Sequence, residues 1–279
     1  MPEPQSGPPR RPYEIPLLVV AVAAAGFNLR TAITSLPPLF PELQTRLHLS
    51  SAGLSLLAAT PVICFGVVSA FAAWLNRRFG EEAILLVALG VLTAGLLLRG
   101  ADPAILLFPG TALAASAIAI LNVLLSSMVK RRWPERAGLG IGIFLSGLSV
   151  GAILGSLLSV PLYNASGDSV PLALGLWAAP AAVAVLLWLP QVGVRGPRVP
   201  VKSVITARVK VHRHALAWQV TAFMGLQSLL YYAALSWLPT MLRDRGVSAA
   251  HAADLLAIMG VGNLAVSLVI PVVAQRMRS

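Results

Sequence analysis

The chain has 279 residues, of which 57% belong to the hydrophobic set AVILMFWYC and only 11% are charged. This composition excludes a disordered chain and argues against an ordinary soluble domain, while the single cysteine, Cys64, excludes a disulfide framework and a multi-cysteine metal site. The net charge of +11 leaves nucleic-acid binding open until the basic residues have been placed.

Eight apolar segments are each long enough to cross a bilayer, which takes about 20 helical residues. The first is too long for the core of a signal peptide and lacks a small-residue cleavage pattern, so we expect it to be retained. The sequence therefore predicts an all-α, polytopic membrane protein. In chain order the expected spans are 15–38, 52–75, 83–99, 104–129, 137–163, 171–190, 215–240 and 249–274.

The basic residues gather on one side of this predicted topology. With the N-terminus inside, the inner segments hold 16 Lys and Arg, the outer segments hold four, and Arg30 lies within a span. An excess of Lys and Arg in short loops marks the cytoplasmic side. We therefore expect a multi-pass protein of the cytoplasmic membrane with both termini in the cytoplasm. The positive charge then reflects topology and lipid contact, with no nucleic-acid partner.

A stretch rich in Pro, Gly and basic residues separates the first six spans from the last two. Such composition is typical of a linker between structural units. We interpret the chain as four segments: 1–14, a cytoplasmic tail; 15–190, a six-helix half; 191–214, a basic cytoplasmic linker; and 215–279, part of a second half.

A weak internal repeat relates the two sides of this linker. Parallel repeats of this kind build one class of secondary transporter, with the substrate bound between the halves. Coincidence is the alternative, because helices that end near Pro and begin at a Ser cap are common. The corresponding pairs are Pro37 with Pro239, Ser50 with Ser248, and Arg77 with Arg276.

Four segments resemble the cyanate and nitroimidazole transporter family within the major facilitator superfamily. They are GFNLRTAITSLPPLFPEL, LLAATPVICFGVVSAFAAWL, SSMVKRRWP and ALSWLPTMLRDRG. The resemblance implies a bundle of six plus six helices, with helices 1, 4 and 7 lining a central cavity. Because the sequence contains only eight spans, we expect the chain to be truncated relative to that array.

The superfamily's loop motif between helices 2 and 3, roughly GxxxD(R/K)xGRR, is present here as AAWLNRRFGEE. The resemblance assigns a gating role to Asn76, Arg77, Arg78 and Gly80. The motif's Asp is replaced by Asn76, and two glutamates stand where the motif ends in a basic pair.

Arg30 is the most informative single residue. An Arg near the centre of a span costs about 2.5–3.5 kcal/mol on insertion scales, so it needs a compensating partner. All ten acidic residues lie in loops or at helix ends. We therefore predict an anion site at Arg30, since a guanidinium suits small planar anions. Three alternatives stay open: Arg30 extends to the surface, bonds carbonyls freed by Pro37 and Pro38, or meets a carboxylate in helices that this chain lacks.

Three neutral polar residues complete the candidate substrate site: Asn122, Gln227 and Tyr231. The resemblance places their spans beside the cavity, and Gln227 and Tyr231, four residues apart, share a helix face. For each, a hydrogen bond between helices is the alternative role. We expect Tyr232 to face elsewhere and Asn28 to bond a neighbouring helix.

Residues near the span ends carry two further expectations. Arg99 ends the third span, and we expect it to extend toward the outer surface. Trp177, Trp188 and Trp237 are candidates for aromatic anchors at the membrane interface.

The fifth span carries a ladder of glycines at spacings of four. Small residues at this spacing let helices approach closely, so we predict a packing stripe that permits sliding during transport. The glycines are Gly138, Gly142, Gly147, Gly151 and Gly155.

Other chemistries find no support. The four histidines lie in loops or at helix starts, and no nucleophile–base arrangement or phosphate loop is present. We expect no metal, no cofactor and no enzymatic activity. The sequence predicts a secondary-active transporter for a small anion or compact polar solute such as cyanate. A drug or nitroimidazole exporter and a non-transporting fragment are the alternatives.

Overall fold

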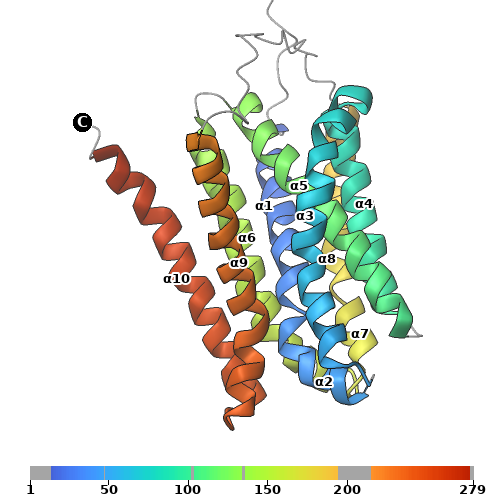
Figure 1. Ribbon diagram of the computed structural model, residues 1–279. Coiled ribbons are helices and arrows are strands. Elements are labelled where there is room, and N and C mark those ends of the chain that lie inside the picture. The colour runs from blue at the N-terminus through green and yellow to red at the C-terminus, as the bar shows by residue number, and fades with distance from the viewer. Residues whose placement is uncertain (1–13, 47, 102–103, 134–135, 194–214, 277–279) are drawn as a thin grey trace, which may run out of the picture.

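The computed structural model describes residues 14–46, 48–101, 104–133, 136–193 and 215–276. Within these ranges every regular element is a helix, and the long helices run side by side in one bundle (Figure 1). The α-helices are α1 (Glu14–Thr34), α2 (Phe40–Arg46), α3 (Ser51–Phe79), α4 (Glu81–Arg99), α5 (Leu107–Arg132), α6 (Ala137–Ala165), α7 (Val170–Gly175), α8 (Ala178–Gly193), α9 (Ala215–Asp244) and α10 (Ala249–Arg276). Two short 3₁₀ helices, η1 (Pro37–Leu39) and η2 (Ala104–Leu106), precede α2 and α5.

Six helical segments of the described chain are long and apolar enough to cross a membrane. The helices α9 and α10 match the seventh and eighth predicted spans in position, although Gln219, Gln227 and two tyrosines lower the hydropathy of α9. The predicted all-α, polytopic fold is therefore confirmed. The six segments are Pro16–Arg46, Ser51–Phe79, Glu81–Arg99, Leu107–Arg132, Ala137–Ala165 and Val170–Gln191.

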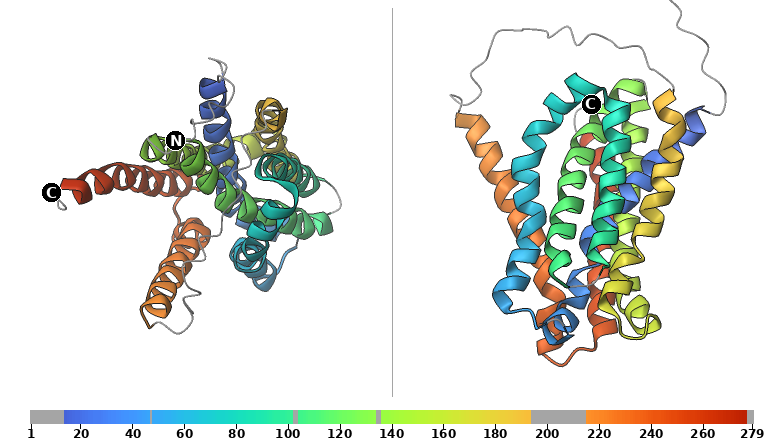
Figure 2. Two further views of the ribbon diagram at one scale, coloured as in Figure 1. Left: turned by 90° about the horizontal axis from the view of Figure 1, so that it is seen from above. Right: turned by 90° about the vertical axis from the view of Figure 1, so that its right-hand side faces the viewer.

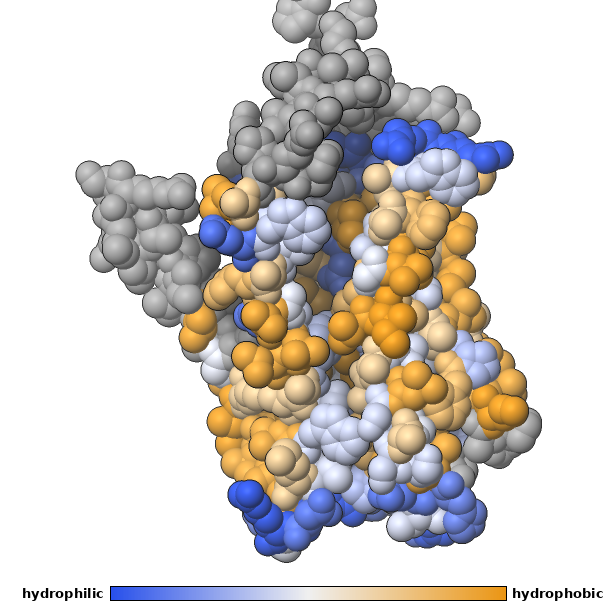
Figure 3. Space-filling model, in the orientation of Figure 1, coloured by the Kyte–Doolittle hydropathy of each residue, from blue (hydrophilic) through white to orange (hydrophobic). Residues whose placement is uncertain are grey.

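The surface has the pattern that a bilayer requires. Hydrophobic residues cover much of the visible flank, while hydrophilic residues gather at its upper and lower edges (Figure 3). Large side chains such as Val67, Val87 and Leu186 are more than half exposed on the outside of the bundle. In water such a surface would aggregate, whereas lipid tails solvate it.

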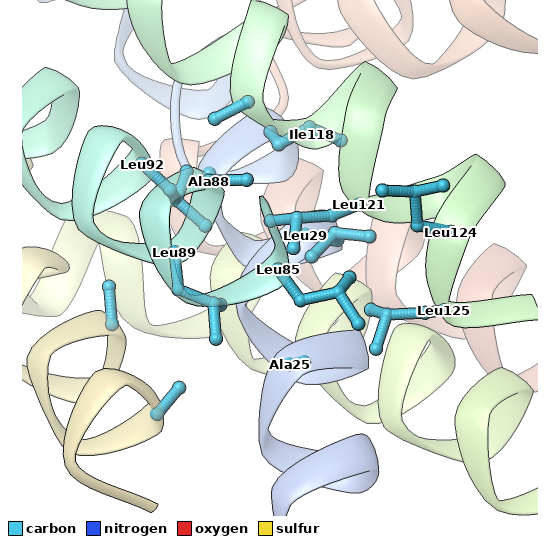
Figure 4. Packing of buried hydrophobic residues seen from close by; sticks show 14 of the residues in the cluster. Ala25, Leu29, Leu85, Ala88, Leu89, Leu92, Ile118, Leu121, Leu124 and Leu125 are labelled. Atoms are coloured by element: carbon cyan, nitrogen blue, oxygen red, sulfur yellow. The ribbon is translucent and has the colours of Figure 1, made fainter. Parts of the chain in front are cut away.

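The core lies where α1, α4 and α5 meet. Leu29 of α1 packs among leucines of α4 and α5, with Leu85 and Leu121 fully buried (Figure 4). The helix α1 also packs along α6 and α8, so it has neighbours on several sides. Helix α1 is therefore enclosed by α4, α5, α6 and α8.

Three glycines of α6 lie against α1. A Cβ placed on Gly147 would stand 2.5 Å from the carbonyl oxygen of Ala23, and one on Gly151 or Gly155 would collide with α1 one or two turns later. The hydroxyl of Thr31 donates to the Gly151 carbonyl oxygen at 3.1 Å. This contact brings the two helix backbones together along the side of α1 that faces α6.

The other two glycines of the predicted ladder have a different setting. A Cβ on Gly138 or Gly142 would meet no atom within 4 Å. These residues lie in the first turns of α6, away from its contact with α1.

The last two helices, α9 and α10, project from the bundle formed by the six spans between α1 and α8. Seen from above, α9 and α10 extend outward as two separate arms (Figure 2). α10 packs on α6 and α9, and α9 packs on η1. Near its end α9 buries Leu235, Ser236 and Pro239, whereas residues 215–227 are exposed or only half-buried. The two parts of the bundle thus meet mainly at the end that holds α2 and η1.

The predicted repeat is partly visible in the structure. Ser50 caps α3 by accepting from the backbone N–H of Gly53 at 3.1 Å, and Ser248 accepts from that of His251 at 3.3 Å. Pro37 follows the end of α1, whereas Pro239 lies inside the continuous helix α9. Similar sequence segments therefore have different backbone geometry. Arg276 closes α10, and its side chain lies outside the described structure.

The tryptophan prediction is wrong for two of the three residues. Trp177 is 5% exposed and Trp188 is fully buried, so their rings fill the core. Trp237 is half-buried and its ring meets that of Phe40 edge-on, with centroids 6.1 Å apart. Position near a span end fails to predict an anchor because it does not show which face of the span packs against the neighbouring helices, and both rings lie on the packed face.

Candidate functional site

Arg30 of α1 lies opposite two consecutive tyrosines of α9. Its guanidinium carbon is 5.1 Å from the ring centroid of Tyr231 and 6.0 Å from that of Tyr232. Its Nη1 donates to the Tyr232 hydroxyl at 3.4 Å. Aromatic faces attract a guanidinium through their negative quadrupole, so both rings stabilise the cation.

The expectation that Tyr232 faces away from the site is wrong. Successive residues of a helix differ by about 100° in direction, yet long side chains can converge on a target beside both. The rings of Tyr231 and Tyr232 lie 5.5 Å apart in a T-shaped pair, with Arg30 at their side. Two adjacent tyrosines in one span are the sequence feature that could have indicated this contact.

Arg30 has no acidic partner among the residues that the structure describes. None of the ion pairs found there includes it, and the residue is half-buried. Its observed contacts are a hydroxyl and two aromatic faces. The guanidinium therefore has donors left for a further ligand.

A small cavity of about 70 Å³ adjoins Arg30. Its polar lining consists of Arg30, Ser149 and Tyr231, from three different helices. An arginine, a serine and a tyrosine around a small space suit an anion or a compact polar molecule. The apolar lining consists of Leu145, Leu148, Ala152 and Gly260.

The other predicted substrate residues lie outside this cavity. Gln227 is exposed on α9, one turn before Tyr231, and Asn122 of α5 is half-buried. Neither contributes to the cavity lining. Of the predicted set, the structure thus brings together only Arg30 and Tyr231, and it adds Ser149 and Tyr232.

The predicted gating loop joins α3 to α4. Asn76, Arg77 and Arg78 belong to the last turn of α3, and Gly80 makes the connection at φ +88°, a conformation that favours glycine. Arg77 and Arg78 are exposed. The guanidinium of Arg78 lies 5.6 Å from the Trp74 ring centroid in the preceding turn.

The two glutamates that follow this loop, at the start of α4, form ion pairs with arginines of α5. Glu82 pairs with Arg132 of α5 at 2.7 Å, and the buried Glu81 pairs with Arg131 and accepts from the Ser127 hydroxyl. The replacement of the motif's final basic pair by glutamates thus creates an electrostatic link between α4 and α5.

At the opposite end an ion pair joins α9 to α2. Nη1 of Arg243 lies 2.9 and 3.0 Å from the two carboxylate oxygens of Glu42 and 3.5 Å from the Pro38 carbonyl oxygen. Together with the contact between Phe40 and Trp237, this pair closes the bundle beside η1.

The prediction for Asn28 is confirmed and that for Arg99 is wrong. The side-chain amide of Asn28 donates to the Pro180 carbonyl oxygen of α8 at 3.0 Å. Arg99 is only 2% exposed and donates to the Ala32 carbonyl oxygen of α1 at 2.7 Å. A position at a helix end predicts extension to the surface only where no neighbouring helix covers that end.

A sequence profile of the Major Facilitator Superfamily matches residues 18–279. The uncharacterized transporter YycB of Bacillus subtilis (strain 168) is 35% identical over 94% of this chain and 64% of its own length. The 2-nitroimidazole transporter of Escherichia coli (strain K12) is 34% identical over 91% of this chain and 65% of its own length. The cyanate transport protein CynX of the same organism is 29% identical over 92% of this chain and 67% of its own length. The chain thus spans about two thirds of the length of these relatives.

Solved structures share the fold at low sequence identity. The crystal structure of a D-xylose-proton symporter matches with a TM-score of 0.69 at 15% identity, over 94% of this chain and 69% of that one. The crystal structure of the POT family transporter PepTSo matches with a TM-score of 0.55 at 20% identity, over 92% of this chain and 53% of that one.

Proposed function

The chain belongs to the major facilitator superfamily, and on that premise we propose that it is a secondary-active transporter for a small anion or compact polar solute. The observation that carries this proposal is Arg30, a cation within a membrane helix whose described contacts include no carboxylate. Ionisable residues within membrane spans mark substrate and ion pathways, and a cation there suits an anion. The cavity beside Arg30 supplies space for it.

The substrate class follows from the chemistry of the cavity. Arg30 supplies the charge, while the hydroxyls of Ser149 and Tyr231 supply neutral hydrogen bonds. The names of two relatives, a cyanate transport protein and a 2-nitroimidazole transporter, support a compact polar solute. We assign Gln227 and Asn122 to the pathway that leads to Arg30, since they share helices with Tyr231 and with the core.

The mechanism is alternating access between two halves, 15–190 and the part that begins at 215, joined by the linker 191–214. Contacts between the halves concentrate at the α2 end, whereas the first turns of α9 are exposed at the other end. This asymmetry supports a conformation closed at the α2 end. The loop from Asn76 to Gly80 then lies at the open end, where it gates the pathway.

The location is the cytoplasmic membrane, with both termini in the cytoplasm, as the distribution of Lys and Arg indicates. In a Cys64→Ser background, Thr45→Cys near the α2 end is expected to react with a membrane-impermeant maleimide in intact cells. Ser203→Cys in the linker is expected to react only after permeabilisation. The reverse pattern would invert the topology.

Uptake by liposomes that contain the purified chain tests the function. Radiolabelled cyanate is expected to enter, Arg30→Gln to abolish uptake, and Arg30→Lys to restore part of it, because a lysine keeps the charge but not the planar fork. Arg46→Gln is the matched control, since Arg46 is exposed near the α2 end and pairs with Asp168 at 3.4 Å. Normal uptake by Arg30→Gln would exclude an anion site at this residue.

A nitroimidazole exporter is the second candidate, and the two tyrosine rings at Arg30 favour it because planar rings stack on aromatic faces. Efflux of 2-nitroimidazole is then expected to survive Arg30→Gln and to fail in Tyr231→Ala. If correctly folded chain moves neither probe, the remaining interpretation is a bundle that does not transport alone.

A further inference from the structure

A second buried arginine lies away from the cavity. Arg99 is the last residue of α4, inside a candidate membrane span, and is only 2% exposed. No ion pair found among the described residues includes it. A buried guanidinium without a carboxylate is costly, so its other partners indicate why it is there.

Those partners belong to the end of α1. Arg99 donates from Nη1 to the carbonyl oxygen of Ala32 at 2.7 Å and from Nη2 to the hydroxyl of Ser35 at 3.1 Å. Its Nε has no partner in the described part of the chain. Two donors of one guanidinium therefore bridge the last turn of α1 and the residue that follows it.

The end of α1 needs such a partner. The last carbonyls of any helix lack intrahelical donors, and Ala32 lies in the last turn of α1, which ends at Thr34. A cation at a helix C-terminus also offsets the negative end of the helix dipole. Arg99 supplies both hydrogen bonds and positive charge at this point.

The surrounding backbone holds Arg99 in place. A Cβ on Gly110 of α5 would stand 2.6 Å from the backbone nitrogen of Arg99, and one on Gly95 would stand 2.6 Å from that of Ala114. Both glycines thus let α5 pass directly against the end of α4. This close approach keeps the guanidinium buried against α1.

The same turn of α1 carries Arg30. The Thr34 hydroxyl donates to the Arg30 carbonyl oxygen at 3.1 Å, and Ala32 is two residues beyond Arg30. Movement of the last turn would therefore move Arg30 relative to the tyrosines of α9.

We propose that Arg99 is a positioning residue that caps α1 from a neighbouring helix and so holds the turn on which Arg30 is presented. The role of Arg30 in this statement rests on the proposed function, whereas the capping of α1 does not. Charge-assisted hydrogen bonds are about twice as strong as neutral ones, which suits a fixed cap.

Hydrogen exchange of the full chain, measured by mass spectrometry, tests the cap without any substrate. In Arg99→Met, the peptide that covers residues 31–36 is expected to exchange faster, while peptides of α5 and α9 stay unchanged. Arg99→Lys, which keeps one donor group, should lie between. Ser35→Ala removes one acceptor and should show a smaller change at the same place, and Arg46→Met, at an exposed arginine, should show none.

Transport by the same variants tests the consequence for Arg30. In Arg99→Met the apparent KM for cyanate is expected to rise about tenfold, with a smaller change in maximal rate and partial rescue by Arg99→Lys. Unchanged exchange at residues 31–36, or equal acceleration in every helix, would overturn the positioning role. If the unaltered chain transports neither cyanate nor 2-nitroimidazole, the proposed function fails, and the exchange data still decide the role of Arg99.

Discussion

At the scale of single residues, the two arginines of the bundle interior are stabilised in different ways. Arg30 contacts aromatic rings and a hydroxyl beside a cavity, whereas Arg99 is enclosed and bonds a helix end. A guanidinium serves both purposes because its donors are planar and fixed in direction. The local sequence made Arg30 a candidate. It did not show that the guanidinium of Arg30 faces a cavity while that of Arg99 is buried against a helix end.

The Tyr232 hydroxyl is expected to orient Arg30. In Tyr232→Phe the ring remains and the hydrogen bond is lost, so the apparent KM for cyanate should rise about three- to tenfold with the maximal rate nearly unchanged. Tyr163→Phe, in the last turns of α6, is the control. Equal kinetics for both variants would show that the hydrogen bond between Arg30 and Tyr232 does not matter for binding.

At the scale of elements, the contact between α1 and α6 depends on glycine. Spacing of four residues predicted a stripe on the fifth span, and Gly147, Gly151 and Gly155 indeed lie at a helix crossing. The same spacing also included Gly138 and Gly142, which meet open space. Periodicity identifies the face that small residues share, but the length of the contact depends on where the partner helix runs.

Gly151→Ala is expected to destabilise the bundle by about 1–3 kcal/mol, because its Cβ would collide with the Phe27 carbonyl of α1. The matched control is Gly142→Ala, where a Cβ meets no atom within 4 Å and helix propensity favours alanine. Thermal unfolding in detergent should show a lower Tm for Gly151→Ala alone. Equal Tm values for the two variants would contradict the close packing of α1 on α6.

At the scale of the whole molecule, the contacts of α9 with the earlier helices lie in its second half, from the tyrosines beside Arg30 to Arg243 beside Glu42. The hydropathy pattern predicted the spans and their order, because each span is recognisable from about 20 local residues. It did not predict that Glu42 and Arg243, from segments on either side of the linker, form an ion pair. Such a pair depends on the approach of two helices that are distant in sequence.

The pair of Glu42 and Arg243 is expected to hold the α2 end closed. In a Cys64→Ser chain that carries Ser149→Cys in the cavity, Glu42→Arg should increase labelling by an impermeant maleimide added at that end. The double change Glu42→Arg with Arg243→Glu should restore the low rate, since it rebuilds the ion pair. Reversal of the exposed pair of Arg46 and Asp168 is the control. No increase in Glu42→Arg would mean that packing alone closes this end.

The sequence by itself determined the helical class, the positions of the spans and the importance of Arg30, because hydropathy and a charge in an apolar segment are local properties. It also indicated the superfamily, through motifs distributed along the chain. Only the tertiary structure decided the partners: Tyr232 lies 202 residues from Arg30, and Ala32 lies 67 residues from Arg99. These contacts depend on helix crossings, and the crossings are set by glycines and prolines whose effect appears only when the helices pack together.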